Sequence, residues 1–265
     1  MTRPATLAYS PALDGIRAFA VLAVMFYHGG TSWAGGGFLG VDVFFVLSGF
    51  LITSLLLIEF EQAGRLDLRA FWGRRARRLL PALFLVLVAV LLYATFLVGE
   101  AASAVRSDAL ATLFYVSNWW FIASGNSYFE QFQDPSPLTH TWSLAIEEQW
   151  YLLLPLVLVL LLPRWRRSRL AWAFVGLAVL SALEMAWLAS PQTDASRVYY
   201  GTDTRLQALL VGATLAAVLT PGVLQKVRVA AVWAGPAALI GLIGFMLLIS
   251  DQSAWMYDGG FLAFA

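Results

Sequence analysis

Two ionisable side chains, Arg17 and His28, lie in the first apolar stretch of the chain. They are eleven residues apart, so a helix at ~100° per residue brings them to within about 20° of one face. Along the axis they are then about 16.5 Å apart, roughly half of a hydrocarbon core of ~30 Å. Because histidine titrates near neutral pH, His28 is a candidate for proton transfer. In the alternative interpretation, Arg17 anchors the helix at the inner boundary and His28 bonds a neighbouring helix.

A second polar pair, Asp42 and Ser48, interrupts the glycine-rich apolar run 35–50. Glycines allow helices to approach closely in a membrane. Ionisable groups at membrane depth are functional candidates, and Asp42 enters from the side that His28 faces. The two side chains could therefore be neighbours. The alternative is that Asp42 only supplies negative charge at a helix start.

Four arginines fall within five residues, at Arg74, Arg75, Arg77 and Arg78. Guanidinium groups bind phosphate through paired hydrogen bonds, and helical spacing brings Arg74 and Arg78, or Arg75 and Arg78, to one face. The cluster is therefore a candidate clamp for a cytosolic ligand that carries phosphates. A topology anchor, or a patch that binds anionic lipid, is the alternative.

The segment 139–151 contains His140 and two adjacent carboxylates, Glu147 and Glu148, at the mouth of an apolar stretch. Carboxylates there are costly unless they are hydrated or used in a site. The same residues would also suit the first turn of a helix. Weaker candidates are Asn118, which interrupts the stretch 109–123, and Arg205, which opens a later span.

The composition requires elements that lie in a membrane. The chain has 265 residues, of which 60% are hydrophobic and 12% charged, against about 25% charged in a soluble domain. The net charge of +1 argues against a nucleic-acid partner. There are no cysteines, which excludes disulfides and thiolate metal sites, and no other metal-ligand spacing occurs. We expect a lipid bilayer partner and no metal.

The hydropathy pattern predicts an all-α, polytopic membrane bundle with about seven full spans and an incomplete eighth. The predicted spans cover 13–33, 39–59, 79–99, 144–162, 170–189, 206–223 and 229–249, and the eighth begins at 259. We expect one membrane domain over 1–265, truncated within that last segment.

Basic residues between the spans predict the topology. They gather at 65–78, at 164–169 and at Lys226 with Arg228, and Lys and Arg prefer cytoplasmic loops. The N-terminus, with Arg3, is then cytoplasmic. An even number of crossings must separate the first two clusters, so the stretch 109–123 is not a full span. We expect it on the outer face, as a re-entrant segment.

Together these segments resemble the acyltransferase-3 family of integral membrane O-acyltransferases. The matching pieces occur in family order across 13–212, which makes coincidence very improbable. They are the segment 13–17 leading to His28, the run ending at Phe50, Arg74-Arg75-x-x-Arg78 before Pro81, Ser117-Asn118-Trp119, the block His140–Tyr151 and Thr204-Arg205-Leu206.

The resemblance implies an acyltransferase in the bacterial cytoplasmic membrane. It implies acetyl-coenzyme A as cytoplasmic donor and a hydroxyl of a glycan or glycosylated small molecule as acceptor. Arg17 and His28 become the expected catalytic pair, with Glu147 and Glu148 beside them. The arginines at 74, 75 and 78 become donor-binding residues. Asp42, Ser48, Asn118, His140 and Arg205 are expected to bind substrate or support the site.

Two other classes of function fit parts of this pattern. A secondary transporter would also bury charge among many spans, but the sequence contains no inverted repeat of broken helices. A non-catalytic subunit of an envelope complex is the third possibility, and a homo-oligomer is left open. An arginine cluster on the inner face favours a donor that carries phosphates over alternating access.

Overall fold

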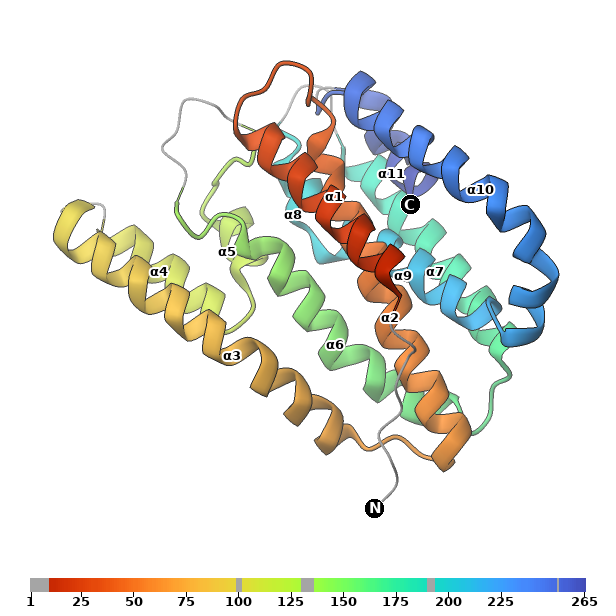
Figure 1. The fold of residues 1–265 in the computed structure, drawn as a ribbon. Coiled ribbons are helices and arrows are strands. Elements are labelled where there is room, and N and C mark those ends of the chain that lie inside the picture. Colours follow the sequence, from red (N-terminus) through yellow and green to blue (C-terminus); the bar gives the residue numbers. More distant parts are fainter. Residues whose placement is uncertain (1–9, 99–101, 130–135, 190–193, 252) are drawn as a thin grey trace.

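The computed structural model describes residues 10–98, 102–129, 136–189, 194–251 and 253–265, and within these ranges every regular element is helical. Figure 1 shows α10 along one edge of the bundle and α3 with α4 along the opposite edge. The predicted all-α fold is confirmed for this part of the chain. The elements are α1 (Pro11–His28), η1 (Gly37–Leu39), α2 (Gly40–Ala63), α3 (Leu68–Tyr93), η2 (Ala94–Val98), α4 (Ala102–Leu113), α5 (Ser117–Ala123), α6 (Thr141–Leu161), α7 (Arg167–Leu188), α8 (Ser196–Tyr200), α9 (Thr202–Val218), α10 (Pro221–Leu248), η4 (Met256–Gly260) and α11 (Phe261–Phe264).

Four helical stretches are long and apolar enough to cross a bilayer, which supports a multi-pass membrane protein. The other predicted spans, 13–33, 206–223 and 229–249, correspond to α1, α9 and α10. The full set of seven spans and the cytoplasmic N-terminus stay predictions, and Arg3 lies outside the described residues. The four stretches are Gly37–Ala63, Leu68–Phe96, Thr141–Leu161 and Arg167–Leu188.

The segment 109–123 is not one helix. It contains the end of α4 and all of α5, and the chain reverses between them at Tyr115, whose φ of 55° lies in the left-handed region. Residues other than glycine rarely adopt this backbone conformation, because their Cβ atom comes too close to neighbouring backbone atoms. The predicted absence of a full span here is therefore confirmed.

Helices α2 and α9 pack so closely that two glycines are required at their contact. A Cβ on Gly49 would lie 2.0 Å from the carbonyl oxygen of Leu209, and one on Gly212 would lie 2.0 Å from that of Val46. Such close packing is a main source of helix association in membranes, where burial from water adds little. The α2–α9 pair forms the centre of the bundle, and α7 packs on α9.

An ion pair between Asp42 and Arg205 joins the same two helices. A guanidinium nitrogen of Arg205 lies 2.7 Å from a carboxylate oxygen of Asp42, and the side chains are 0% and 1% exposed. The Arg205 guanidinium also lies over the rings of Phe261, at 4.3 Å, and Tyr199, at 4.7 Å. A buried charge of this kind is tolerated only while its oppositely charged partner is present.

We predict that Asp42→Ala strongly destabilises the protein, because it leaves the Arg205 guanidinium buried without its counter-charge. Breaking such a pair costs about 3–5 kcal/mol, whereas replacing both charges by apolar groups is much less harmful. The double variant Asp42→Leu/Arg205→Met should recover most of the thermal stability, measured on the detergent-solubilised protein. A double variant as unstable as Asp42→Ala would contradict this.

Candidate functional site

His28 ends α1 and contacts two residues from distant parts of the chain. Its Nε2 lies 2.9 Å from the hydroxyl oxygen of Tyr128, and its ring centroid lies 4.4 Å from that of His140, the residue before α6. The two histidines that the sequence singles out are therefore neighbours. Burial raises the pKa of the Tyr128 phenol, so the phenol keeps its proton at neutral pH. The tautomer of His28 decides which of the two groups donates this hydrogen bond.

Burial lowers the pKa of His140 from its ordinary value of 6.5. The charged form loses hydration as the ring packs into the site, which makes protonation less favourable. Burial therefore favours the neutral form of His140.

An aromatic cluster surrounds Tyr128. Its ring centroid lies 4.5 Å from that of Tyr199 and 5.8 Å from that of Trp142, and Trp142 lies 4.8 Å from Tyr199. The hydroxyl of Tyr199 donates to the carbonyl oxygen of Phe38. Sequence reasoning missed Tyr128 and Tyr199. The available signal was their type, since tyrosine combines an apolar ring with a hydroxyl that seeks a partner.

A cavity of about 310 Å³ lies beside this cluster, between α1, α2 and α6. Its walls are mostly apolar, and the polar side chains of Tyr128, His140, Ser143 and Glu147 could bind a reacting group. Pockets of this character are typical ligand sites. The lining residues are Val21, Val24, Met25, Val41, Phe44, Phe45, Tyr128, His140, Trp142, Ser143, Leu144 and Glu147.

Glu147 joins the cavity to α2. The hydroxyl of Ser48 donates to its Oε1 at 2.6 Å, so two residues chosen separately from the sequence meet here. Helix α6 begins at Thr141, and its first turn contains no acidic residue. The interpretation of Glu147 and Glu148 as helix-start charges is therefore wrong, because both lie beyond the first turn.

Glu148 binds α3 through Arg75. Two nitrogens of Arg75, Nε and Nη2, donate to its Oε1 at 3.0 and 2.8 Å, and the guanidinium lies 3.9 Å from the ring centre of Tyr151. The Arg75 side chain is 18% exposed. Arg74 and Arg78 are exposed on the same helix, and Arg74 lies 3.8 Å from Glu59. Arg75 thus has a different environment from the other two predicted phosphate ligands.

Arg17 lies on α1 with His28, as the spacing predicts, but the two side chains do not meet. The Nη1 of Arg17 is 3.0 Å from Oδ1 of Asp14, one turn earlier, and its side chain is 37% exposed. Asp42 pairs with Arg205 and not with His28. It also lies in the first turn of α2, which agrees with its helix-start interpretation. The ion pair with Arg205 was not predicted.

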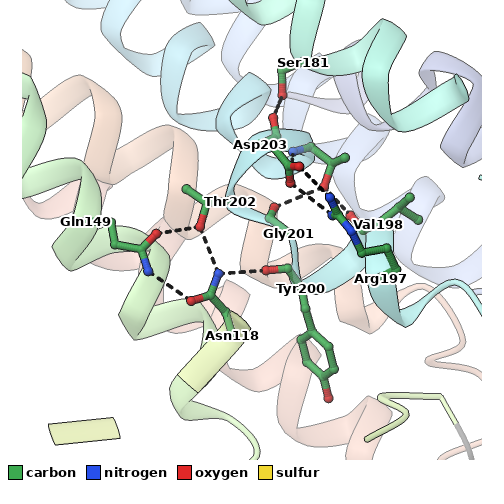
Figure 2. Close-up of polar contacts among 10 residues, drawn as sticks. Asn118, Gln149, Ser181, Arg197, Val198, Tyr200, Gly201, Thr202 and Asp203 are labelled. Atoms are coloured by element: carbon green, nitrogen blue, oxygen red, sulfur yellow. Dashed lines mark hydrogen bonds and ion pairs between the residues drawn. The ribbon is translucent and has the colours of Figure 1, made fainter. Parts of the chain in front are cut away.

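Asn118 is buried, and it belongs to a partly buried network with Gln149 and Thr202, shown in Figure 2. Its Nδ2 donates to the carbonyl of Tyr200 at 3.1 Å and to the hydroxyl of Thr202 at 2.9 Å. The network ties α5 and α6 to the connection between α8 and α9. Sequence reasoning identified Asn118 but not Gln149 or Thr202.

The arrangement suits transfer of a proton beside a partly open, mostly apolar cavity. An imidazole with a fixed hydrogen-bond partner can act as a general base or carry an acyl group. Among the described residues, no group of three or more acidic or histidine side chains could hold a metal ion. Arg74 and Arg78 remain accessible for an anionic ligand.

Comparison with known proteins agrees with the motifs. The chain is 48% identical over 260 residues to "Peptidoglycan O-acetyltransferase OatA" of Listeria monocytogenes, with 96% of this chain and 42% of that protein covered. It is 44% identical over 259 residues to "O-acetyltransferase OatA" of Staphylococcus aureus, with 96% and 43% covered. The chain thus spans less than half the length of these relatives, and no solved structure matches it.

A family model described as an acyltransferase domain matches residues 10–265. This range contains the histidine pair, the cavity and the α6 carboxylates described above. The chain belongs to this family of acyltransferase domains, the acyltransferase-3 family that its motifs resemble.

Proposed function

We propose that this protein is a membrane O-acetyltransferase that moves an acetyl group from cytoplasmic acetyl-coenzyme A to a hydroxyl of a cell-wall glycan. The observation that carries the proposal is the position of His28, held by Tyr128 and His140 where they border an apolar cavity. The curated relatives are named O-acetyltransferases, one of them for peptidoglycan. The cellular location that follows is the bacterial cytoplasmic membrane.

The donor half of the proposal rests on the start of α3. Coenzyme A carries phosphates, and the exposed guanidinium groups of Arg74 and Arg78 can bind phosphate through paired hydrogen bonds. Arg75 has a different role, because its nitrogens are bonded to Glu148. It fixes α3 to α6 and so orients the neighbouring arginines toward a ligand.

In the proposed reaction, His28 takes the proton from the acceptor hydroxyl as the hydroxyl oxygen attacks the thioester carbonyl. The new C–O bond forms, the C–S bond breaks, and the proton passes to the leaving thiolate. In this step Nε2–H of His28 donates to the phenol oxygen of Tyr128, which orients the ring and leaves Nδ1 free to take the proton. A brief acyl-histidine would give the same products in two steps.

Arg17 and Glu147 have supporting roles in this scheme. Arg17 lies toward the inner end of α1 and is partly exposed, so it can bind the phosphates of the donor. Glu147 lines the cavity with one oxygen bonded to Ser48, and it can accept a hydrogen bond from the acceptor. Glu148 contributes indirectly, because it holds the Arg75 guanidinium in place.

We predict that His28→Ala lowers acetyl transfer by about a hundredfold or more, the usual contribution of a general base. The assay measures acetylated glycan and free coenzyme A in membranes that contain the full-length protein. The amount of folded protein, measured by size-exclusion chromatography in detergent, should stay close to wild type. Near-normal product from this variant would overturn the assignment. Release of coenzyme A that depends on acceptor also separates an acyltransferase from a transporter.

Tyr128→Phe tests the orientation of His28. The variant keeps the ring that packs on Tyr199 but removes the hydroxyl 2.9 Å from Nε2 of His28. We expect the transfer rate to fall about tenfold to a hundredfold, because small misplacements of a catalytic group are costly. Tyr93→Phe is the matched control, since Tyr93 is exposed at the end of α3. Equal rates for the two variants would contradict the orienting role.

A further inference from the structure

The three side chains of Asn118, Gln149 and Thr202 form a closed hydrogen-bonded ring (Figure 2). Gln149 Nε2 donates to Asn118 Oδ1 at 3.0 Å, Asn118 Nδ2 donates to Thr202 Oγ1 at 2.9 Å, and Thr202 Oγ1 donates to Gln149 Oε1 at 2.6 Å. The remaining amide hydrogens go to the backbone carbonyls of Tyr115 and Tyr200. Every polar side-chain hydrogen of the ring is used, which fixes its geometry.

One bond of the ring leads toward His28. The carbonyl that Asn118 holds belongs to Tyr200, which ends α8. The preceding residue, Tyr199, packs on Tyr128 with ring centroids 4.5 Å apart, and the ring of Tyr200 lies 5.8 Å from the same side chain. Tyr128 in turn bonds His28 at 2.9 Å. The position of the imidazole therefore depends on where the end of α8 is held.

The other side of the ring fixes α6. Gln149 follows Glu147 and Glu148, and at ~100° per residue three consecutive side chains leave a helix in three directions. Glu147 meets Ser48 of α2, Glu148 meets Arg75 of α3, and Gln149 meets the ring. A rotation of α6 that breaks one of these contacts strains the others.

We propose that Asn118, Gln149 and Thr202 are positioning residues for acyl transfer. The ring holds the end of α8 and, through Tyr199 and Tyr128, keeps the His28 imidazole in place for proton transfer. This inference rests on the proposed function of His28. It concerns residues that do not touch the reacting groups, so their loss should slow the chemical step more than it weakens donor binding.

The same connection offers a matched control on its opposite side. Arg197 pairs with Asp203 at 2.6 Å, and Figure 2 shows this pair across Gly201 from Gln149. The side chains of Arg197 and Asp203 are 37% and 24% exposed. The variant Arg197→Gln removes a contact of the same short segment, and neither Arg197 nor its partner Asp203 belongs to the ring.

The main test compares Thr202→Val with Thr202→Ser in membranes that contain the full-length protein and acetyl-coenzyme A. Valine has the shape of threonine without its hydroxyl, so it opens the ring, whereas serine keeps the hydroxyl. For Thr202→Val we expect kcat per folded protein to fall about tenfold or more, with the KM for acetyl-coenzyme A within about twofold of wild type. Thr202→Ser and Arg197→Gln should keep kcat within about twofold.

Three results would overturn the inference. One is an unchanged kcat for Thr202→Val, and another is a loss confined to the amount of folded protein. The third is a Thr202→Ser variant as slow as Thr202→Val. If Thr202→Val does not fold, Asn118→Asp replaces it, because aspartate keeps the acceptor for Gln149 but cannot donate to Tyr200, and the same kcat loss is expected. Failure of the proposed function is seen separately, as wild-type membranes that transfer no acetyl group, and the inference then fails with it.

Discussion

Polar side chains at membrane depth must find partners inside the protein, because lipid offers none. One turn of α6 meets this constraint for much of the bundle. Glu147, Glu148 and Gln149 each bind a different neighbour, which fixes α6 against α2, α3, α5 and the start of α9. The cavity lies along the same helix, and His140 precedes its first residue. The contacts that hold the helices together thus also determine the shape of the candidate site.

The α2–α9 contact supplies a second fixed element on the other side of the cavity. Close backbone packing at Gly49 and Gly212 and the buried pair of Asp42 and Arg205 hold these helices in one register. The guanidinium of Arg205 lies over Tyr199, which packs on Tyr128. Contacts from both α6 and α9 therefore help to hold the side chains that position His28. A general base benefits from such support because its efficiency depends on a narrow range of geometry.

Much of this could be predicted from the sequence, and the rest could not for physical reasons. Hydropathy predicted helices, and the spacing of Arg17 and His28 predicted a shared helix. Residue type identified Ser48 and Glu147, but only the packing of α2 on α6 shows that they bond. The sequence does not show which of Arg74, Arg75 and Arg78 bonds to Glu148, because this depends on how α3 packs against α6. Tyr128 and Tyr199 were missed, because aromatic residues are common in membrane helices and loops, and their role appears only where distant segments meet.

Transfer across the bilayer is the central claim, and sealed inside-out vesicles test it most directly. Isotopically labelled acetyl-coenzyme A, which does not cross membranes, is supplied outside, at the cytoplasmic face, and a glycan acceptor is enclosed in the lumen. If the donor binds at the cytoplasmic face and the acceptor at the opposite face, labelled acetyl esters appear on the enclosed glycan while intact donor stays outside. Product that forms only when donor and acceptor share one side would contradict the transmembrane mechanism.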